Sequence, residues 1–161
     1  MSSPTPRPVF LYGTLCAQPL LAWALTGDAS NTSAVSQLIR PARVHGYSRV
    51  SLRGRDYPAA IKHEPHSLVD GYLLMLETTS QRKKLDNFEG KAFKPVSVAV
   101  TIFDSENKPQ EKTVEADISI WAGEESALTT DPWELEVFEK ERLEAWLDLF
   151  QGVKLVGESE D

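Results

Sequence analysis

The acidic residue Glu89 lies in a setting suited to proton transfer. It stands between the aromatic Phe88 and the turn-forming Gly90, in the segment LDNFEG. A carboxylate beside an aromatic side chain can be desolvated, and desolvation raises its pKa toward the range useful for general acid/base catalysis. The alternative is a solvated acid at a helix C-terminus, which the helix dipole mildly disfavours. The residue types at this position leave both interpretations open.

A second candidate is the segment YGTL, residues 12–15, which follows a short apolar run that ends at Gly13. A strand that stops at a glycine and leads into a helix exposes successive backbone N–H groups. Such groups can bind a carboxylate or a developing oxyanion. The same junction also occurs as an ordinary turn, so YGTL alone does not decide between the two.

The histidines, the cysteine and Tyr57 do not form a recognisable catalytic or metal-binding motif. His45, His63 and His66 lack the spacing of a zinc motif and have no supporting cysteine cluster, so we expect no metal site. Cys16 has no identifiable histidine partner, and we expect a small buried residue there. Tyr57, in a Tyr-Pro pair, could form a wall of the pocket or simply pack on its proline. The sequence contains no P-loop, dinucleotide fingerprint or Gly-x-Ser-x-Gly elbow.

The pattern of apolar and turn-forming residues predicts the elements that must position these residues. Glycines interrupt two of the predicted strands: Gly46 indicates a bulge, and Gly71 a close approach of another backbone. A loop is expected at 28–34, and Ala60 and Ile61 could rejoin a strand after the Tyr57-Pro58 turn. The expected strands are 9–12, 42–52, 68–76, 95–103 and 112–123, the last two as a hairpin, and the expected helices are 18–27, 78–90 and 131–150.

The last expected helix begins with Asp131 as N-cap and Pro132 in its first turn. Its apolar residues have helical spacing at Leu143, Trp146, Leu147 and Phe150. Five or six strands with three helices indicate an α+β barrel or curled sheet, mostly antiparallel and covered by helices. We expect a loose N-terminus at 1–8, one domain at 9–150 and an acidic tail at 151–161.

Length and charge restrict the possible partners. A chain of 161 residues favours one domain, and its net charge of −7 argues against nucleic acid or an anionic membrane as a partner. The single cysteine cannot form an internal disulfide, and neither a membrane span nor a secretory signal is visible. We therefore expect a cytoplasmic protein that binds a small molecule, as a monomer or a homodimer.

The order of several motifs resembles the gamma-glutamylcyclotransferase-like family, and its AIG2-like branch in particular. The resemblance covers roughly residues 8–150, and the motifs that carry it are VFLYGTL, RVHGYSRV, DYPAAI, LVDGYLLML and LDNFEGKAF. It implies a small mixed β-barrel flanked by helices. It also implies a transferase or lyase reaction without a cofactor, in which a gamma-glutamyl amine or gamma-glutamyl amino acid releases 5-oxoproline.

The resemblance assigns roles residue by residue. Tyr12, Gly13, Thr14 and Leu15 would line the substrate site through backbone amides, and Glu89 would be the general acid/base. After Glu-Gly this branch usually has a tyrosine and then a basic residue. Phe93 takes the aromatic place here without a hydroxyl, and Lys94-Pro95 follow where an arginine is common. Phe93 is therefore a candidate for altered substrate specificity.

Two other functions remain open at the level of sequence. The first keeps the Glu89 pocket but isomerises or cyclises another small metabolite. The second is a non-catalytic interaction module, for which the only support is the row of acids in the last helix. Those acids are also explained by a solvated helix face, and they are Glu134, Glu136, Glu139, Glu141 and Glu144.

Overall fold

The computed structural model describes residues 6–89, 92–104, 106 and 108–151, and within this part the side chains of 87–89, 150 and 151 are excluded. Gly90 and residues 152–161 of the tail predicted at 151–161 lie outside the described residues. The limits expected for the N-terminal segment, domain and tail stay predictions.

The described chain is built around a closed five-stranded barrel with the strand order β1-β5-β2-β6-β7. All neighbouring strands are antiparallel except β1 and β7, which pair in parallel and close the barrel. The strands are β1 (Val9–Leu11), β2 (Ile39–His45), β5 (Leu68–Leu74), β6 (Phe93–Phe103) and β7 (Pro109–Trp121). The predicted α+β class with a mixed, mostly antiparallel barrel is confirmed, as is the β6–β7 hairpin.

A second, two-stranded sheet lies beside the barrel. It consists of β3 (Tyr47–Ser51) and β4 (Pro58–Lys62) in antiparallel pairing. The expectation of one bulged strand over 42–52 was wrong. Gly46 adopts the left-handed backbone conformation, with φ 86°, which turns the chain out of β2 and into the second sheet. The strand expected near Ala60 and Ile61 is confirmed as β4.

Close packing inside the barrel depends on Gly71 of β5. A Cβ atom at this position would lie 2.0 Å from the carbonyl oxygen of Leu11. The barrel interior is filled by large side chains from all five strands, including Phe10, Val44, Leu73, Val100 and Ile118. The prediction that Gly71 marks a close backbone approach is confirmed.

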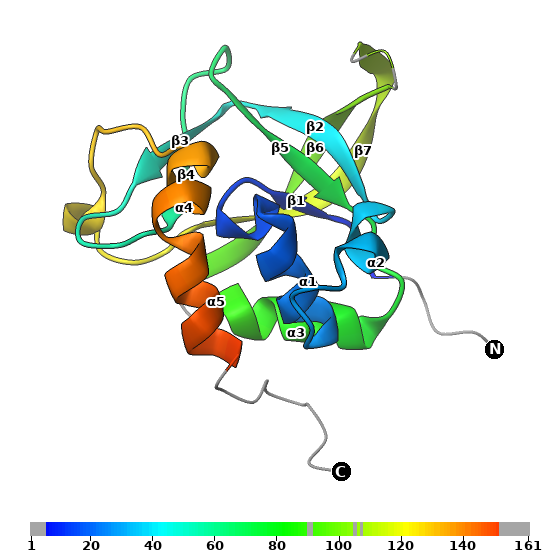
Figure 1. The fold of residues 1–161 in the computed structure, drawn as a ribbon. Coiled ribbons are helices and arrows are strands. Elements are labelled where there is room, and N and C mark those ends of the chain that lie inside the picture. The colour runs from blue at the N-terminus through cyan, green and yellow to red at the C-terminus, as the bar shows by residue number, and fades with distance from the viewer. Residues whose placement is uncertain (1–5, 90–91, 105, 107, 152–161) are drawn as a thin grey trace.

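The helices gather on one side of the barrel, where α1, α3 and α5 lie together (Figure 1). A second core fills this interface and includes Leu20, Leu21 and Leu85. None of the described helices has the length and apolar character needed to span a membrane. The helical segments are η1 (Thr14–Cys16), α1 (Gln18–Thr26), α2 (Thr32–Ser36), α3 (Thr79–Glu89), η2 (Glu125–Ala127), α4 (Leu135–Glu141) and α5 (Leu143–Gln151).

The first and second predicted helices, 18–27 and 78–90, correspond to α1 and α3, with ends that differ by at most one residue. α1 ends at Gly27, which has φ 81° and donates its N–H to the Trp23 carbonyl. α3 begins with a reciprocal cap, because the Gln81 N–H donates to Thr78 Oγ1 and the Thr78 N–H donates to Gln81 Oε1. In contrast, the loop expected at 28–34 contains the start of the short helix α2.

The single helix expected over 131–150 was wrong. Asp131 and Pro132 precede the helix, because their carbonyl oxygens accept hydrogen bonds from the N–H and Oγ of Ser51 on β3. These bonds hold the segment against the small sheet, so α4 starts only at Leu135. Arg142, with φ −125° and ψ −25°, then separates α4 from α5. The predicted apolar face of α5 packs on the core through Leu143, Trp146 and Leu147.

Candidate functional site

Tyr12 lies at the end of β1 and joins three strands through its side chain. Its ring is buried, and its hydroxyl donates to the Ser119 carbonyl of β7 at 2.5 Å. The same hydroxyl accepts a hydrogen bond from the Ala60 N–H of β4 at 3.1 Å. Tyr12, the first residue of YGTL, is thus held by both the barrel and the small sheet. These bonds fix the position from which Gly13, Thr14 and Leu15 continue.

Gly13, Thr14 and Leu15 form a tight turn. The carbonyl groups of Gly13 and Thr14 accept hydrogen bonds from the N–H groups of Cys16 and Ala17, at 2.9 and 3.0 Å. The side chains of Thr14 and Leu15 are buried. Among the hydrogen bonds between described residues, none is donated by the backbone N–H of Gly13, Thr14 or Leu15. What this turn can offer a ligand is therefore its backbone amides, as expected at the start of a helical turn.

The small sheet closes over this turn at Gly13. A Cβ atom at position 13 would lie 3.1 Å from Cδ of Pro58, tighter than an ordinary van der Waals contact. The absence of a side chain at Gly13 thus lets the first residue of β4 approach the turn. Tyr57 precedes Pro58, so the Tyr-Pro pair lies next to the YGTL segment.

Tyr57 and Phe93 are neighbours in the structure. Their ring centroids are 6.1 Å apart, and both side chains are partly buried. Phe93 also contacts Trp121 edge-on at 5.4 Å, and Tyr57 contacts Trp146 of α5 at 6.3 Å. The Tyr57 hydroxyl accepts a hydrogen bond from Nη1 of Arg55. Two candidates for the pocket, Tyr57 and Phe93, are thus in contact with each other, and Tyr57 directly precedes the Pro58 that lies against Gly13.

Glu89 is the last residue of α3, and its side chain is outside the described residues. The helix that carries it is firmly held. Leu85, four residues earlier, is 1% exposed in the core. Arg82 Nη1 lies 2.9 Å from Asp117 of β7, and Arg82 Nε lies 3.0 Å from Asp86. Burial lowers the pKa of Arg82, but the two carboxylates outweigh this effect and raise it.

Arg49 of β3 contacts the YGTL segment and was not predicted from the sequence. Its Nη1 donates to the Tyr12 carbonyl at 2.9 Å and lies 3.4 Å from the Asp70 carbonyl. Its guanidinium also lies over the Trp133 ring, 5.5 Å from the ring centroid. The sequence shows only an arginine in a strand, and Tyr12 is 37 positions away, so no local pattern indicates this contact.

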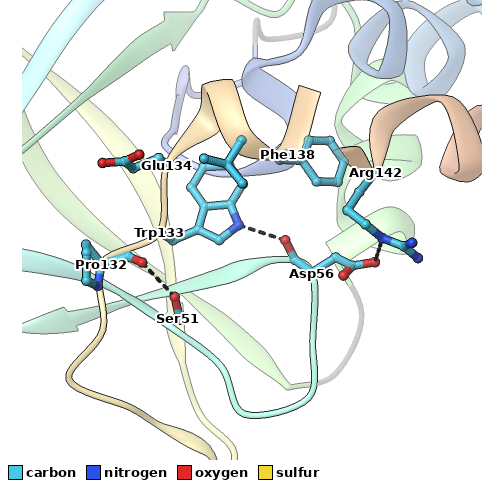
Figure 2. Close-up of a pocket in the computed structure, with 8 residues that line it drawn as sticks. Ser51, Asp56, Pro132, Trp133, Glu134, Phe138 and Arg142 are labelled. Atoms are coloured by element: carbon cyan, nitrogen blue, oxygen red, sulfur yellow. Dashed lines mark hydrogen bonds and ion pairs between the residues drawn. The ribbon is translucent and has the colours of Figure 1, made fainter. Parts of the chain in front are cut away.

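Asp56, the residue before Tyr57, joins the C-terminal helices to the site (Figure 2). Its carbonyl accepts from Trp133 Nε1 at 2.7 Å, and its Oδ2 accepts from Arg142 Nε and Trp146 Nε1, both at 2.9 Å. Burial of the Asp56 carboxyl raises its pKa, but the bonds from Trp146 and Arg142 and the charge of Arg142 outweigh burial and lower it. Asp56 is thus held as a carboxylate.

A partly open pocket of about 350 Å³ lies on the α4 side of Asp56 (Figure 2). None of the site residues predicted from the sequence lines it, so it is separate from the YGTL segment. Its lining residues are Ser51, Asp56, Pro132, Trp133, Glu134, Val137, Phe138 and Arg142.

The remaining reactive residue types lie away from the site or within the core. Cys16 is buried, as expected. His63 and His66 are exposed, with Nδ1 of His63 2.5 Å from Ser67 Oγ and Nε2 of His66 3.0 Å from Glu64. Within the described part of the chain, no three His, Cys, Asp or Glu residues gather as a metal cluster would require.

The chain is similar in sequence and in fold to several other proteins. Protein AIG2 B of Arabidopsis thaliana is 27% identical over 113 residues, which is 70% of this chain and 63% of that protein. The chain thus spans just under two thirds of this relative. The fold is similar to the solution structure of an Arabidopsis thaliana protein, with a TM-score of 0.61, 21% identity, and coverage of 94% of this chain and 85% of that one.

A crystal structure of a yeast gamma-glutamyl cyclotransferase specific to glutathione is also similar. The TM-score is 0.56 at 13% identity, over 79% of this chain and 73% of the yeast chain. At such identities the two structural similarities show the fold alone. The model of the family described as gamma-glutamyl cyclotransferase, AIG2-like, matches residues 9–150. The chain therefore belongs to the gamma-glutamyl cyclotransferase, AIG2-like family.

Proposed function

We propose that this protein is a gamma-glutamyl cyclotransferase that releases 5-oxoproline and an amine from a gamma-glutamyl amine or gamma-glutamyl amino acid. The observation that carries the proposal is the meeting of Gly13, the Tyr57-Pro58 pair and Phe93, four residues after the end of α3 at Glu89. The family to which the chain belongs gives this arrangement its reaction class.

The reaction joins two groups of one substrate molecule. The α-amine of the glutamyl moiety attacks its own γ-carbonyl carbon, and the bond from that carbon to the leaving nitrogen then breaks. No water is consumed, because the ring nitrogen replaces the leaving amine. Holding the flexible glutamyl chain in a folded conformation gives ring closure the high effective molarity of a well-oriented intramolecular reaction.

Glu89 supplies the proton transfers in this proposal. The α-amine enters as an ammonium group and attacks only after losing a proton, which the Glu89 carboxylate accepts. The resulting carboxylic acid donates that proton to the leaving nitrogen. Glu89 then accepts the second proton that the ring nitrogen loses, and this proton passes to the released amine, so Glu89 returns to its starting state. Helical spacing puts position 89 on the same face of α3 as the buried Leu85, and this supports the assignment.

The backbone amides of Gly13, Thr14 and Leu15 bind negative charge in this proposal. They bind either the substrate carboxylate or the oxyanion that forms on the γ-carbonyl oxygen during attack. Both roles need N–H groups that the protein does not itself use, which fits the hydrogen bonds of the described residues. Phe93 and Tyr57, whose rings contact each other, supply an aromatic wall of the substrate pocket in this proposal.

The test is to measure 5-oxoproline release from a panel of gamma-glutamyl amines and gamma-glutamyl amino acids. We expect turnover of at least one panel member by the wild-type protein. Glu89→Gln keeps the size of the side chain but removes the proton acceptor, so kcat should fall by roughly 100-fold or more. Glu111→Gln, on the exposed surface of β7, is the matched control and should keep full activity.

Two outcomes would contradict the proposal. The first is a folded wild-type protein that releases no 5-oxoproline from any panel member. The second is a Glu89→Gln variant that is as active as the Glu111→Gln control.

A further inference from the structure

We infer that Arg49 is a positioning residue, which fixes the direction of the Gly13 N–H by holding the carbonyl of the same peptide group. This inference rests on the proposed function, since it concerns the turn that binds substrate there. Arg49 Nη1 donates to the Tyr12 carbonyl at 2.9 Å.

The planar peptide bond links the direction of the Tyr12 carbonyl to that of the Gly13 N–H. The Tyr12 carbonyl and the Gly13 N–H belong to one trans peptide unit, so they point in opposite directions. A guanidinium that holds the carbonyl on one side therefore directs the N–H to the other side. Rotation of the whole unit would break the bond to Arg49, and that bond is stronger than one between neutral groups because its donor is charged.

Gly13 makes such a restraint necessary. A glycine has no Cβ to limit its backbone angles, so the peptide unit before it rotates more easily than one before another residue. A Cβ atom at position 13 would lie 3.1 and 3.2 Å from Cδ and Cγ of Pro58, so the proline would have to shift by a few tenths of an ångström to admit a side chain. The close approach of β4 thus favours glycine, and Arg49 supplies the restraint that glycine lacks.

The Arg49 side chain is itself fixed in place. Its guanidinium lies over the ring of Trp133, which is 9% exposed and donates to the Asp56 carbonyl. The Arg49 Nη1 also lies 3.4 Å from the Asp70 carbonyl of β5. Contacts from β5 and from the segment before α4 thus hold the guanidinium against the Tyr12 carbonyl, which directly follows β1. A positioning group needs such support.

The test combines kinetics with the amide signals of the turn. Arg49→Gln removes the charge, and Arg49→Lys keeps the charge but loses the planar fork. We expect kcat/KM to fall roughly 10- to 100-fold in Arg49→Gln and less in Arg49→Lys. A fall in kcat would assign the amides to the oxyanion, and a rise in KM would assign them to the substrate carboxylate.

The second readout is the backbone amide NMR signal of Gly13 during titration with 5-oxoproline. In the wild type this signal should move, and in Arg49→Gln it should start from a different position and respond less. Arg43→Gln is the matched control, because Arg43 is also a strand arginine but bonds the exposed carboxylate of Asp70. It should leave the Gly13 signal and kcat/KM within about twofold of wild type.

The outcomes separate this inference from the proposed function. If the wild-type protein shows no turnover, the proposed function is wrong. The Gly13 amide signal then still reports whether Arg49 fixes the direction of the Gly13 N–H. Wild-type turnover with Arg49 variants that match the Arg43→Gln control in both readouts would overturn the role of Arg49 alone. If Arg49→Gln does not fold, Arg49→Lys carries the same comparison.

Discussion

At the scale of single residues, the site depends on groups that approach the YGTL turn from distant parts of the chain. Pro58 lies against Gly13, and Phe93 lies against Tyr57. The turn and the two aromatic residues could be proposed from the sequence because each belongs to a short motif. Arg49 and Asp56 could not, since their contacts join positions 37 and as many as 90 residues apart.

Phe93 should influence which leaving amine is accepted. Phe93→Tyr restores the hydroxyl that the resemblance leads us to expect, with little change in ring size. We expect kcat/KM for polar leaving amines to rise about 3- to 10-fold relative to apolar ones, measured by 5-oxoproline release. Phe103→Tyr, at the other end of β6 beneath Arg43, is the matched control. Equal substrate preferences in the two variants would remove Phe93 from the specificity site.

Asp56 should contribute to stability in a pH-dependent way. Its pKa is lower in the folded state than in the unfolded chain, so its carboxylate stabilises the fold fully above the unfolded-state pKa. This contribution is lost as the pH falls through the folded-state pKa. Asp56→Asn should cost about 1–3 kcal/mol near neutral pH, because Arg142 and Trp146 lose a charged acceptor.

The measurement is the free energy of unfolding of wild type and Asp56→Asn by urea at a series of pH values. The difference should be constant near neutral pH and shrink below about pH 4. Asp148→Asn, on the exposed face of α5, serves as the control and should show a smaller difference. A difference for Asp56→Asn that does not depend on pH would show that its charge is not what stabilises the fold.

At the scale of elements, the barrel depends on the close approach of β1 and β5. Gly71→Ala would place a methyl group 2.0 Å from the Leu11 carbonyl oxygen, and backbone atoms cannot move aside cheaply. We expect a loss of about 2–4 kcal/mol in the free energy of unfolding, measured by denaturant titration.

Gly54→Ala is the control for this prediction. Gly54 has a φ of 71° and open space around it, so the variant should lose only about 1 kcal/mol through backbone strain. If both variants lost the same amount, the close approach at Gly71 would not be the reason for its glycine.

The start of α3 shows why this element could be predicted while others could not. The helix start is determined by neighbouring residues in the sequence, because Thr78 and Gln81 form its cap. α4 is different: the pattern at Asp131 and Pro132 is a good helix start, but Ser51 of β3 takes their carbonyl groups. A tertiary contact across 81 positions overrides a local signal there.

At the scale of the whole molecule, the barrel, the hairpin and the helical layer could be predicted because apolar periodicity reports burial. The division into a barrel and a small sheet could not. It depends on Gly46, whose positive φ changes the direction of the chain, and a glycine in a strand pattern equally suggests a bulge. This division is what brings β4 and Tyr57 to the YGTL turn.

In the proposed reaction the substrate's own amine, and not water, attacks the γ-carbonyl. The most direct test is to run the reaction in water labelled with the heavy oxygen isotope and to identify the products by mass spectrometry. We predict 5-oxoproline and free amine in equal amounts, with no label in the 5-oxoproline. Labelled glutamate as the first product, or no release of amine from any gamma-glutamyl substrate, would contradict the account.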